Sequence, residues 1–241
     1  VWLTLPELRP ALRLFHLHLN TLGFIGLAAL GTLPVLLPTT LGRPEATAAD
    51  RLLRDLSIAA GGAVLVAAGA ASAVWLAVIG AFLLLWVAVH NLIAWRRAFG
   101  ARSIIGAGGT ASLAAATAGF ILLILFGVSH GLGWIEARPS LAAYVALFLL
   151  PLVTGALSHL LPVWRYPGVA SSERNEMASR LAWSGQWRAL LFLAGGLLLM
   201  FGQTGGIYAV AVGLALFVVA LSRAFWLDRA GTSDDNSRPI L

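Results

Sequence analysis

Long apolar runs make up most of this chain, and short stretches rich in charge, glycine or proline separate them. The predicted membrane spans are residues 11–38, 50–71, 73–97, 103–131, 139–164, 186–203 and 206–227. These runs approach or exceed the ~20 residues that an α-helix needs to cross the apolar core of a bilayer. The alternating ~10-residue segments typical of membrane β-barrels do not occur in the sequence. The pattern therefore predicts an all-α, polytopic integral membrane protein in a lipid bilayer.

Two boundaries between spans fall inside apolar sequence. No charged residue occurs from Leu56 to Trp95, which is too long a run for one span and long enough for two. We therefore expect a turn near Gly69–Ala73. Gly205 and Gly206 make a similar tight turn between the last two spans. A short interfacial helix is expected within residues 165–185.

The charged residues orient this bundle. Hydrophobic residues make up 59% of the chain and charged residues 11%, against ~25% charged in soluble domains. All 16 basic residues are arginines; with seven spans, thirteen fall on one face and only Arg9, Arg13 and Arg138 on the other. The positive-inside rule then places the N-terminus outside and the C-terminus in the cytoplasm. Residues 1–228 are predicted to form one transmembrane bundle, and residues 229–241 a disordered cytoplasmic tail.

Several chemistries are excluded or disfavoured by composition. The chain has no cysteine, which excludes disulfides, iron–sulfur clusters and covalent c-type haem. A nucleic-acid partner is not expected, because no basic cluster interleaves with aromatic residues in a polar segment. No charged residue lies in the middle of a predicted span, which disfavours proton pumps and secondary transporters. The glycine run at residues 106–110 is read as helix packing rather than as a phosphate loop.

Histidines are the titratable side chains that do occur inside the apolar runs, and two of them belong to an inner layer. His90 and His159 each lie six residues before an arginine, Arg96 and Arg165 respectively. At a rise of 1.5 Å per residue, both lie about 9 Å inside the cytoplasmic boundary. Because an ionisable group in hydrocarbon is costly, each is a candidate functional residue.

The other three histidines belong to an outer layer. His130 lies six residues before Glu136, and His16 and His18 follow Arg13 by three and five residues. His16 and His18 point to different faces of an α-helix, so one of the two is expected to enter a given site. A single histidine near a helix end often only reaches towards the interface, but two layers at matching depths favour metal or haem ligation.

Haem b, in one or two copies, fits these layers because its iron takes two axial imidazoles at one depth. His90 with His159, and His130 with either His16 or His18, meet this requirement. Arg13, Arg96 and Arg165 are candidate partners of the haem propionates, although topology is their primary explanation. The three outer histidines would equally suit a three-imidazole copper or zinc site.

Three segments resemble known haem and copper membrane proteins: HLHLNTLGFIGLAALGTLPVLLPT (residues 16–39), SHGLG (129–133) and GALSHLLPVWR (155–165). They are similar to small relatives of haem–copper oxidase subunit I and to NnrS-type haem/copper proteins, especially membrane proteins associated with copper nitrite reductases of some prokaryotes. The resemblance implies haem or copper ligation by His16, His18, His130 and His159, in the cell membrane of a prokaryote. The chain departs from those families in having seven predicted spans rather than twelve, and in lacking an adjacent histidine pair.

The leading hypothesis is a b-type cytochrome that relays electrons to a partner oxidoreductase, as a subunit rather than as a self-contained enzyme. A copper nitrite reductase or a cytochrome is the expected protein partner, and quinol a further candidate. One alternative is an NnrS-like haem/copper protein that handles nitric oxide or nitrite-derived species. Another is a cofactor-free membrane anchor of a larger complex.

Overall fold

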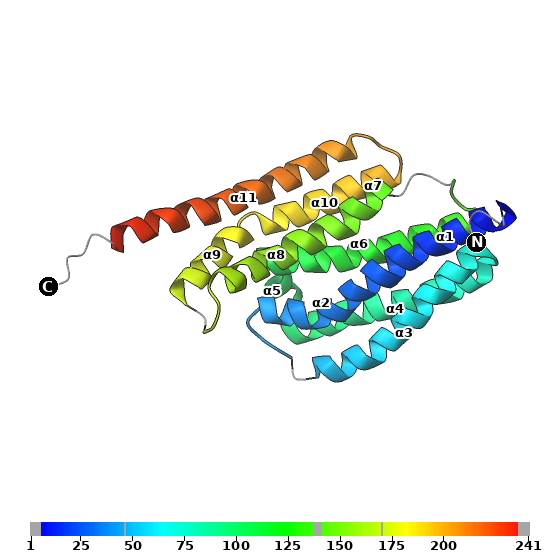
Figure 1. Cartoon of the computed structure of the whole chain (residues 1–241), viewed down its shortest axis with the longest axis horizontal. Coiled ribbons are helices and arrows are strands. Elements are labelled where there is room, and N and C mark those ends of the chain that lie inside the picture. Colours follow the sequence, from blue (N-terminus) through cyan, green and yellow to red (C-terminus); the bar gives the residue numbers. More distant parts are fainter. Residues whose placement is uncertain (1–5, 46, 137–140, 170, 236–241) are drawn as a thin grey trace. The chain divides into compact units, whose positions relative to one another are not determined.

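The computed structural model describes residues 6–45, 47–136, 141–169 and 171–235, and every regular element in these ranges is helical (Figure 1). Six helical stretches of the described chain are long and apolar enough to cross a membrane: Arg9–Thr40, Ala48–Ala71, Val74–Phe99, Gly108–Gly131, Leu141–Arg165 and Gly206–Trp226. The prediction of an all-α, multi-pass membrane protein is confirmed.

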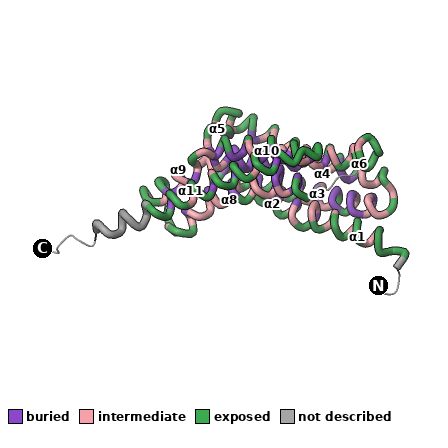
Figure 2. The backbone as a smooth tube through the Cα atoms, turned by 90° about the horizontal axis from the view of Figure 1, so that it is seen from above, coloured by how far each residue is buried: buried purple, intermediate pink, exposed green. Residues whose placement is uncertain are grey.

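Large apolar side chains cover the outside of the helices, as a lipid-facing surface requires. Phe24 is 77% exposed and Phe82 is 67% exposed, although both lie within apolar helices. Figure 2 shows exposed residues recurring along the length of the helices, between the buried ones. A soluble domain rarely exposes so large an apolar surface to water.

The chain divides into two compact units. The first contains Val1–Gly100 and Thr117–Pro139, and the second contains Ala101–Ala116 and Ser140–Leu241. Helix α6 (Gly108–Gly131) contributes its beginning to the second unit and its end to the first. A single bundle over residues 1–228 stays a prediction.

The first unit begins with a long helix whose winding changes along its length. It consists of η1 (Pro6–Leu8), α1 (Arg9–His18), the π-helical η2 (Leu19–Gly26) and α2 (Leu27–Thr40). Helices α3 (Ala48–Ala71) and α4 (Val74–Phe99) follow and are joined at Ser72–Ala73, which confirms the predicted turn.

Helices α3 and α4 pack closely because glycines face each other across them. A Cβ atom on Gly62 would lie 2.8 Å from the carbonyl oxygen of Gly80, and one on Gly69 would collide with the backbone of Ala77. The two helices run antiparallel. Residues 55 and 90 therefore lie at the same level of the pair.

The second unit contains the remaining helices. They are α5 (Ala101–Gly106), the start of α6, α7 (Leu141–Tyr144), η3 (Val145–Leu149), α8 (Leu150–Arg165), α9 (Ser172–Ala182), α10 (Gly185–Met200) and α11 (Gly206–Asp235). Helix α9 confirms the helix expected within residues 165–185. Helix α10 has 16 residues, fewer than a typical span, so seven spans and the orientation of the termini stay predictions.

One predicted boundary was wrong. The span expected at residues 103–131 is broken at Ala107 into α5 and α6, because the surrounding glycines weaken the helix. Helix α11 runs to Asp235, and the disordered tail expected from residue 229 stays a prediction. Residues 236–241 of that tail lie outside the described residues.

Candidate functional site

His90 of α4 pairs with a buried carboxylate on α3. Its Nδ1 lies 3.2 Å from Oδ2 of Asp55, and Oδ1 of Asp55 accepts a hydrogen bond from Arg54 Nε at 3.0 Å. Asp55 is only 3% exposed. With Asp55 ionised, the contact requires the proton of His90 on Nδ1, because a carboxylate only accepts hydrogen bonds. Its Nε2 has no hydrogen-bond partner among the described residues and is available as a ligand.

The imidazole of His90 is held on a second side by an aromatic ring. The ring of Trp86 stacks on it with the centroids 6.4 Å apart and the planes inclined by 21°. Trp86 precedes His90 by one helical turn, so the α-helix itself brings the two rings together. Orientation by a carboxylate and a neighbouring side chain is typical of metal-ligating histidines.

Buried polar atoms without partners lie close to this pair. Oδ1 of Asn91 and Nε1 of Trp95 have no hydrogen-bond partner among the described residues, and both residues are 1% exposed. On α3, Arg51 keeps an unpaired Nε while its two terminal nitrogens bind the carboxylate of Glu45 at 2.7 and 2.8 Å. Buried polar groups are normally paired, so this end of the α3–α4 pair is a polar interior.

Two outer histidines have the same kind of fixed ring. Nδ1 of His18 donates to the carbonyl of Leu14 at 2.8 Å, and Nδ1 of His130 donates to that of Ile135 at 3.4 Å. In both residues Nε2 is left unbonded within the described chain. His16 is exposed and its side chain makes no such bond. The sequence left open which of these two histidines is the outer ligand, and the fixed ring of His18 favours His18 over His16.

A contact in the first unit relates the depths of His18 and His130. Gly26 of η2 packs on Phe120 of α6, since a Cβ there would lie 3.3 Å from the Phe120 ring. The N-terminal end of α1 and the C-terminal end of α6 lie at the same end of the first unit (Figure 1). His18 precedes Gly26 by eight residues and His130 follows Phe120 by ten. Both are then displaced in the same direction, and along the α-helical α6 the step from Phe120 to His130 is about 15 Å.

His159 lies in the second unit, on α8. It is half-buried and its ring makes no hydrogen bond with another described residue. Its neighbour Ser158 is buried and donates to the carbonyl of Thr154 at 2.7 Å. Because His90 belongs to the first unit, the inner pairing of His90 with His159 stays a prediction.

The arginines expected near the haem propionates lie on the surface. Arg13, Arg96 and Arg165 are exposed, and the guanidinium carbon of Arg165 lies 5.5 Å from the centre of the Tyr166 ring. Arg138 lies outside the described residues. Exposure suits both the topological role and contact with an anionic group, so the second role stays a prediction.

The described residues include no group of three or more histidine, cysteine, aspartate or glutamate side chains placed to hold a metal ion. The three-imidazole copper or zinc site of His16, His18 and His130 therefore gains no support. A haem needs less from the protein, because the macrocycle supplies four of the nitrogen ligands.

Sequence reasoning missed two buried charges, Asp55 and Arg188, which are 3% and 0% exposed. Both lie close to the start of a predicted span, where a charge reads as a boundary marker. The pairing of Asp55 with His90 joins residues 35 positions apart and arises only when α3 and α4 pack. The sequence did contain one sign of this buried charge, because Asp55 lies inside the span predicted at residues 50–71, close to its start.

No protein-family model matches the chain, and no curated protein and no solved structure matches it either.

Proposed function

We propose that this membrane protein binds haem b through histidine and relays electrons to a partner oxidoreductase. The observation that carries the proposal is the His90–Asp55 pair, which holds Nδ1–H on a buried carboxylate and leaves Nε2 free. A structural histidine near a helix end has no need of a buried anion. A ligand histidine does, because the carboxylate fixes the ring and makes it more basic.

Of the glycines close to the candidate histidines, one leaves open space for a flat group. A Cβ on Gly127, one turn before His130, would meet nothing within 4 Å. At Gly26 the same position is filled by Phe120, and at Gly155, one turn before His159, by Leu113. These last two glycines serve helix packing. The side of α6 at Gly127 and His130 is the one that leaves room for a macrocycle.

Each residue has a defined role in this proposal. His90 would hold an inner haem, and His130 with His18 an outer one; His159 as the partner of His90 stays a prediction from the sequence. Asp55 positions His90, while exposed arginines at the helix ends neutralise the propionates. The bound haem supplies reversible one-electron chemistry. The apolar helices keep water from it, which limits side reactions at the iron.

Absorption spectroscopy of the purified chain tests the proposal. We expect a Soret band and a dithionite-reduced minus oxidised spectrum typical of bis-histidine haem. His159→Ala should remove an inner haem and leave an outer one intact. His18→Ala should disturb the outer haem and its neighbour His16→Ala should not, which makes the second variant a matched control.

The cofactor-free anchor is the outcome that would overturn the proposal. It predicts no Soret band, no iron, and normal stability after all five histidines are replaced. The NnrS-like alternative predicts bound copper and a reduced spectrum that changes with carbon monoxide. The expected setting is the cell membrane of a prokaryote, beside a copper nitrite reductase or a cytochrome, with quinol as a candidate donor.

A further inference from the structure

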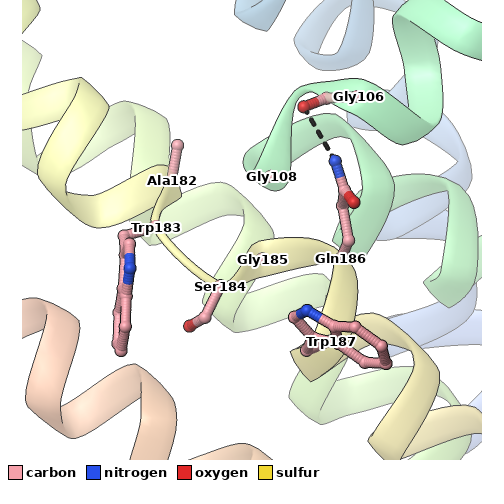
Figure 3. A pocket seen from close by; sticks show the side chains of 8 residues that line it. All are labelled: Gly106, Gly108, Ala182, Trp183, Ser184, Gly185, Gln186 and Trp187. Atoms are coloured by element: carbon pink, nitrogen blue, oxygen red, sulfur yellow. Dashed lines mark hydrogen bonds between the residues drawn. The ribbon is translucent and has the colours of Figure 1, made fainter.

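Buried side-chain atoms without a hydrogen-bond partner occur at two places in the described chain. One is in the second unit, where they belong to Ser184 and Arg188. Ser184 has a strained φ of 58° in the loop before α10 and lines a pocket of about 370 Å³ (Figure 3). Trp183 and Trp187 also line this pocket and are 45% and 65% exposed. The other place lies between α3 and α4, and its residues are almost completely enclosed.

The enclosed place contains one hydrogen-bond acceptor and two donors. Oδ1 of Asn91 is the acceptor, and Nε1 of Trp95 and Nε of Arg51 are the donors. Asn91 and Trp95 are each 1% exposed, and the side chain of Arg51 is 11% exposed. Burying these three atoms unpaired would be unfavourable, because each has lost its bonds to bulk water. The site therefore calls for a bound group that supplies the missing bonds.

Helix packing brings these side chains to one level of the α3–α4 pair. A Cβ atom on Gly62 would lie 3.1 Å from Cγ of Leu84, so these two residues face each other. Arg51 precedes Gly62 by eleven residues, and Trp95 follows Leu84 by eleven. Eleven residues make about three helical turns, so each helix returns to the same face. Because the helices are antiparallel, Arg51 and Trp95 lie opposite each other, and Asn91 is one turn away.

The chemistry of these atoms restricts what can bind. Asn91 and Trp95 lie one turn apart on α4, with Cβ atoms about 5–6 Å apart on one face. A small group that forms hydrogen bonds of ~2.9 Å with both side chains can bridge such a separation. It must accept a hydrogen bond from Trp95 and donate one to Asn91. A metal cation cannot accept from an N–H group, and a fully ionised anion cannot donate to an amide oxygen.

We infer that a bound water molecule bridges Asn91 and Trp95 between α3 and α4. Its oxygen accepts from Nε1 of Trp95 and from Nε of Arg51, and one of its hydrogens is donated to Oδ1 of Asn91. About three hydrogen bonds are typical of a water molecule buried in a protein. The two terminal nitrogens of Arg51 bind Glu45, so the water connects this ion pair on α3 to α4. The inference does not depend on the proposed haem.

Nuclear magnetic resonance of the full chain in detergent tests the inference, with the nine tryptophans labelled with ¹⁵N in the indole ring. Trp95→Phe identifies the indole signal of Trp95 by its loss. In the wild type we expect a rotating-frame cross-peak between this indole proton and water, with the sign of dipolar contact rather than of chemical exchange. Trp75→Phe removes a 61% exposed indole from the same helix and should leave this cross-peak unchanged.

Removing the acceptor tests the bridge itself. Asn91→Leu should weaken the cross-peak at least fivefold. In thermal unfolding, Asn91→Leu combined with Trp95→Phe should lower the Tm by less than the sum of the two single losses, because no polar partner of the water then remains on α4. If Trp95→Phe does not fold, the indole signal that changes most in Asn91→Leu identifies Trp95.

Two outcomes would overturn the inference. The first is the absence of a dipolar cross-peak to water at the Trp95 indole of the wild type. If this absence accompanies non-additive losses of Tm, Asn91 and Trp95 are bonded directly to each other. The second is a cross-peak that keeps its full intensity in Asn91→Leu, which would show that Asn91 does not hold the water.

Discussion

At the residue scale, charges that the sequence places near helix ends become buried partners. Asp55 and Arg54 lie next to each other in the chain, yet the side chain of Asp55 is 4% exposed and that of Arg54 is 60% exposed. The helix turns one side chain towards α4 and its neighbour towards the surroundings. A buried carboxylate needs hydrogen-bond donors, and His90 and Arg54 provide them.

Replacing Asp55 tests its role as the residue that positions His90. In Asp55→Asn the negative charge is lost, so ferric haem is less stabilised and the midpoint potential of the inner haem should rise. Loss of such a partner typically weakens cofactor affinity about 10–100-fold. Redox titration and haem titration measure the two effects. Asp50→Asn, an exposed carboxylate on the same helix, is the control.

The acid sensitivity of the chain should depend on Glu45. Bidentate hydrogen bonds from Arg51 lower the pKa of this carboxyl, with a smaller contribution from Thr47. A lowered pKa means that the pair stabilises the fold above the ordinary pKa of the carboxyl, and that this stability is lost as pH falls through the lowered value. Thermal unfolding between pH 6 and pH 3 should show a contribution of about 1 kcal/mol or less, absent in Glu45→Gln. Glu136→Gln should behave like the wild type.

At the element scale, small residues and one proline set how the helices wind and pack. The π-helical η3 ends just before Pro151, which has no N–H to donate and whose ring pushes the preceding turn outwards. Gly196 of α10 contacts Leu147 of η3 too closely for a side chain without movement of the neighbour. In the first unit the close approach of α3 and α4 brings Asp55 to His90.

Two adjacent glycines on α3 should respond oppositely to the same substitution. In Gly62→Ala the new methyl would meet the Gly80 carbonyl oxygen at 2.8 Å, so overpacking should cost about 1–3 kcal/mol of unfolding free energy. In Gly61→Ala it would meet nothing within 4 Å, so the better helix propensity of alanine should leave stability unchanged or raise it by about 1 kcal/mol. Thermal unfolding in detergent compares them. Equal losses in both variants would contradict the proposed close packing of α3 on α4.

At the scale of the whole molecule, the number of membrane crossings depends on α10. Its 16 residues give a length of about 24 Å, less than the ~30 Å of a bilayer core. The arginine distribution nevertheless assigns it a crossing, because without it the last arginines would change sides.

Labelling of single cysteines decides between six and seven crossings, and the natural absence of cysteine makes the experiment direct. With seven crossings, Gln203→Cys and Ser72→Cys should both react with a membrane-impermeant maleimide from the outside of intact cells. Asn175→Cys should react only after the cells are opened. Protection of Gln203→Cys in intact cells would show that α10 does not cross.

Much of the fold could be predicted because a bilayer imposes simple requirements. Apolar runs of sufficient length must become helices, and a forty-residue run without charge must contain a turn, which lies at Ser72–Ala73. The break at Ala107 could not be predicted in this way, because hydropathy does not register helix propensity. The histidines could be identified as candidates because an ionisable side chain is costly in hydrocarbon. Their hydrogen-bond partners could not be identified from the sequence.

The sequence by itself determined the class of protein, the helical segments and the five candidate histidines, because these follow from local composition and from the cost of polar groups in lipid. Tertiary structure decided which of these histidines is oriented, and by what. It paired His90 with Asp55 and buried Arg188 beside a strained loop. The His90–Asp55 pair depends on side chains from separate helices, and only helix packing brings them within bonding distance, whereas the bond of His18 forms within α1 itself.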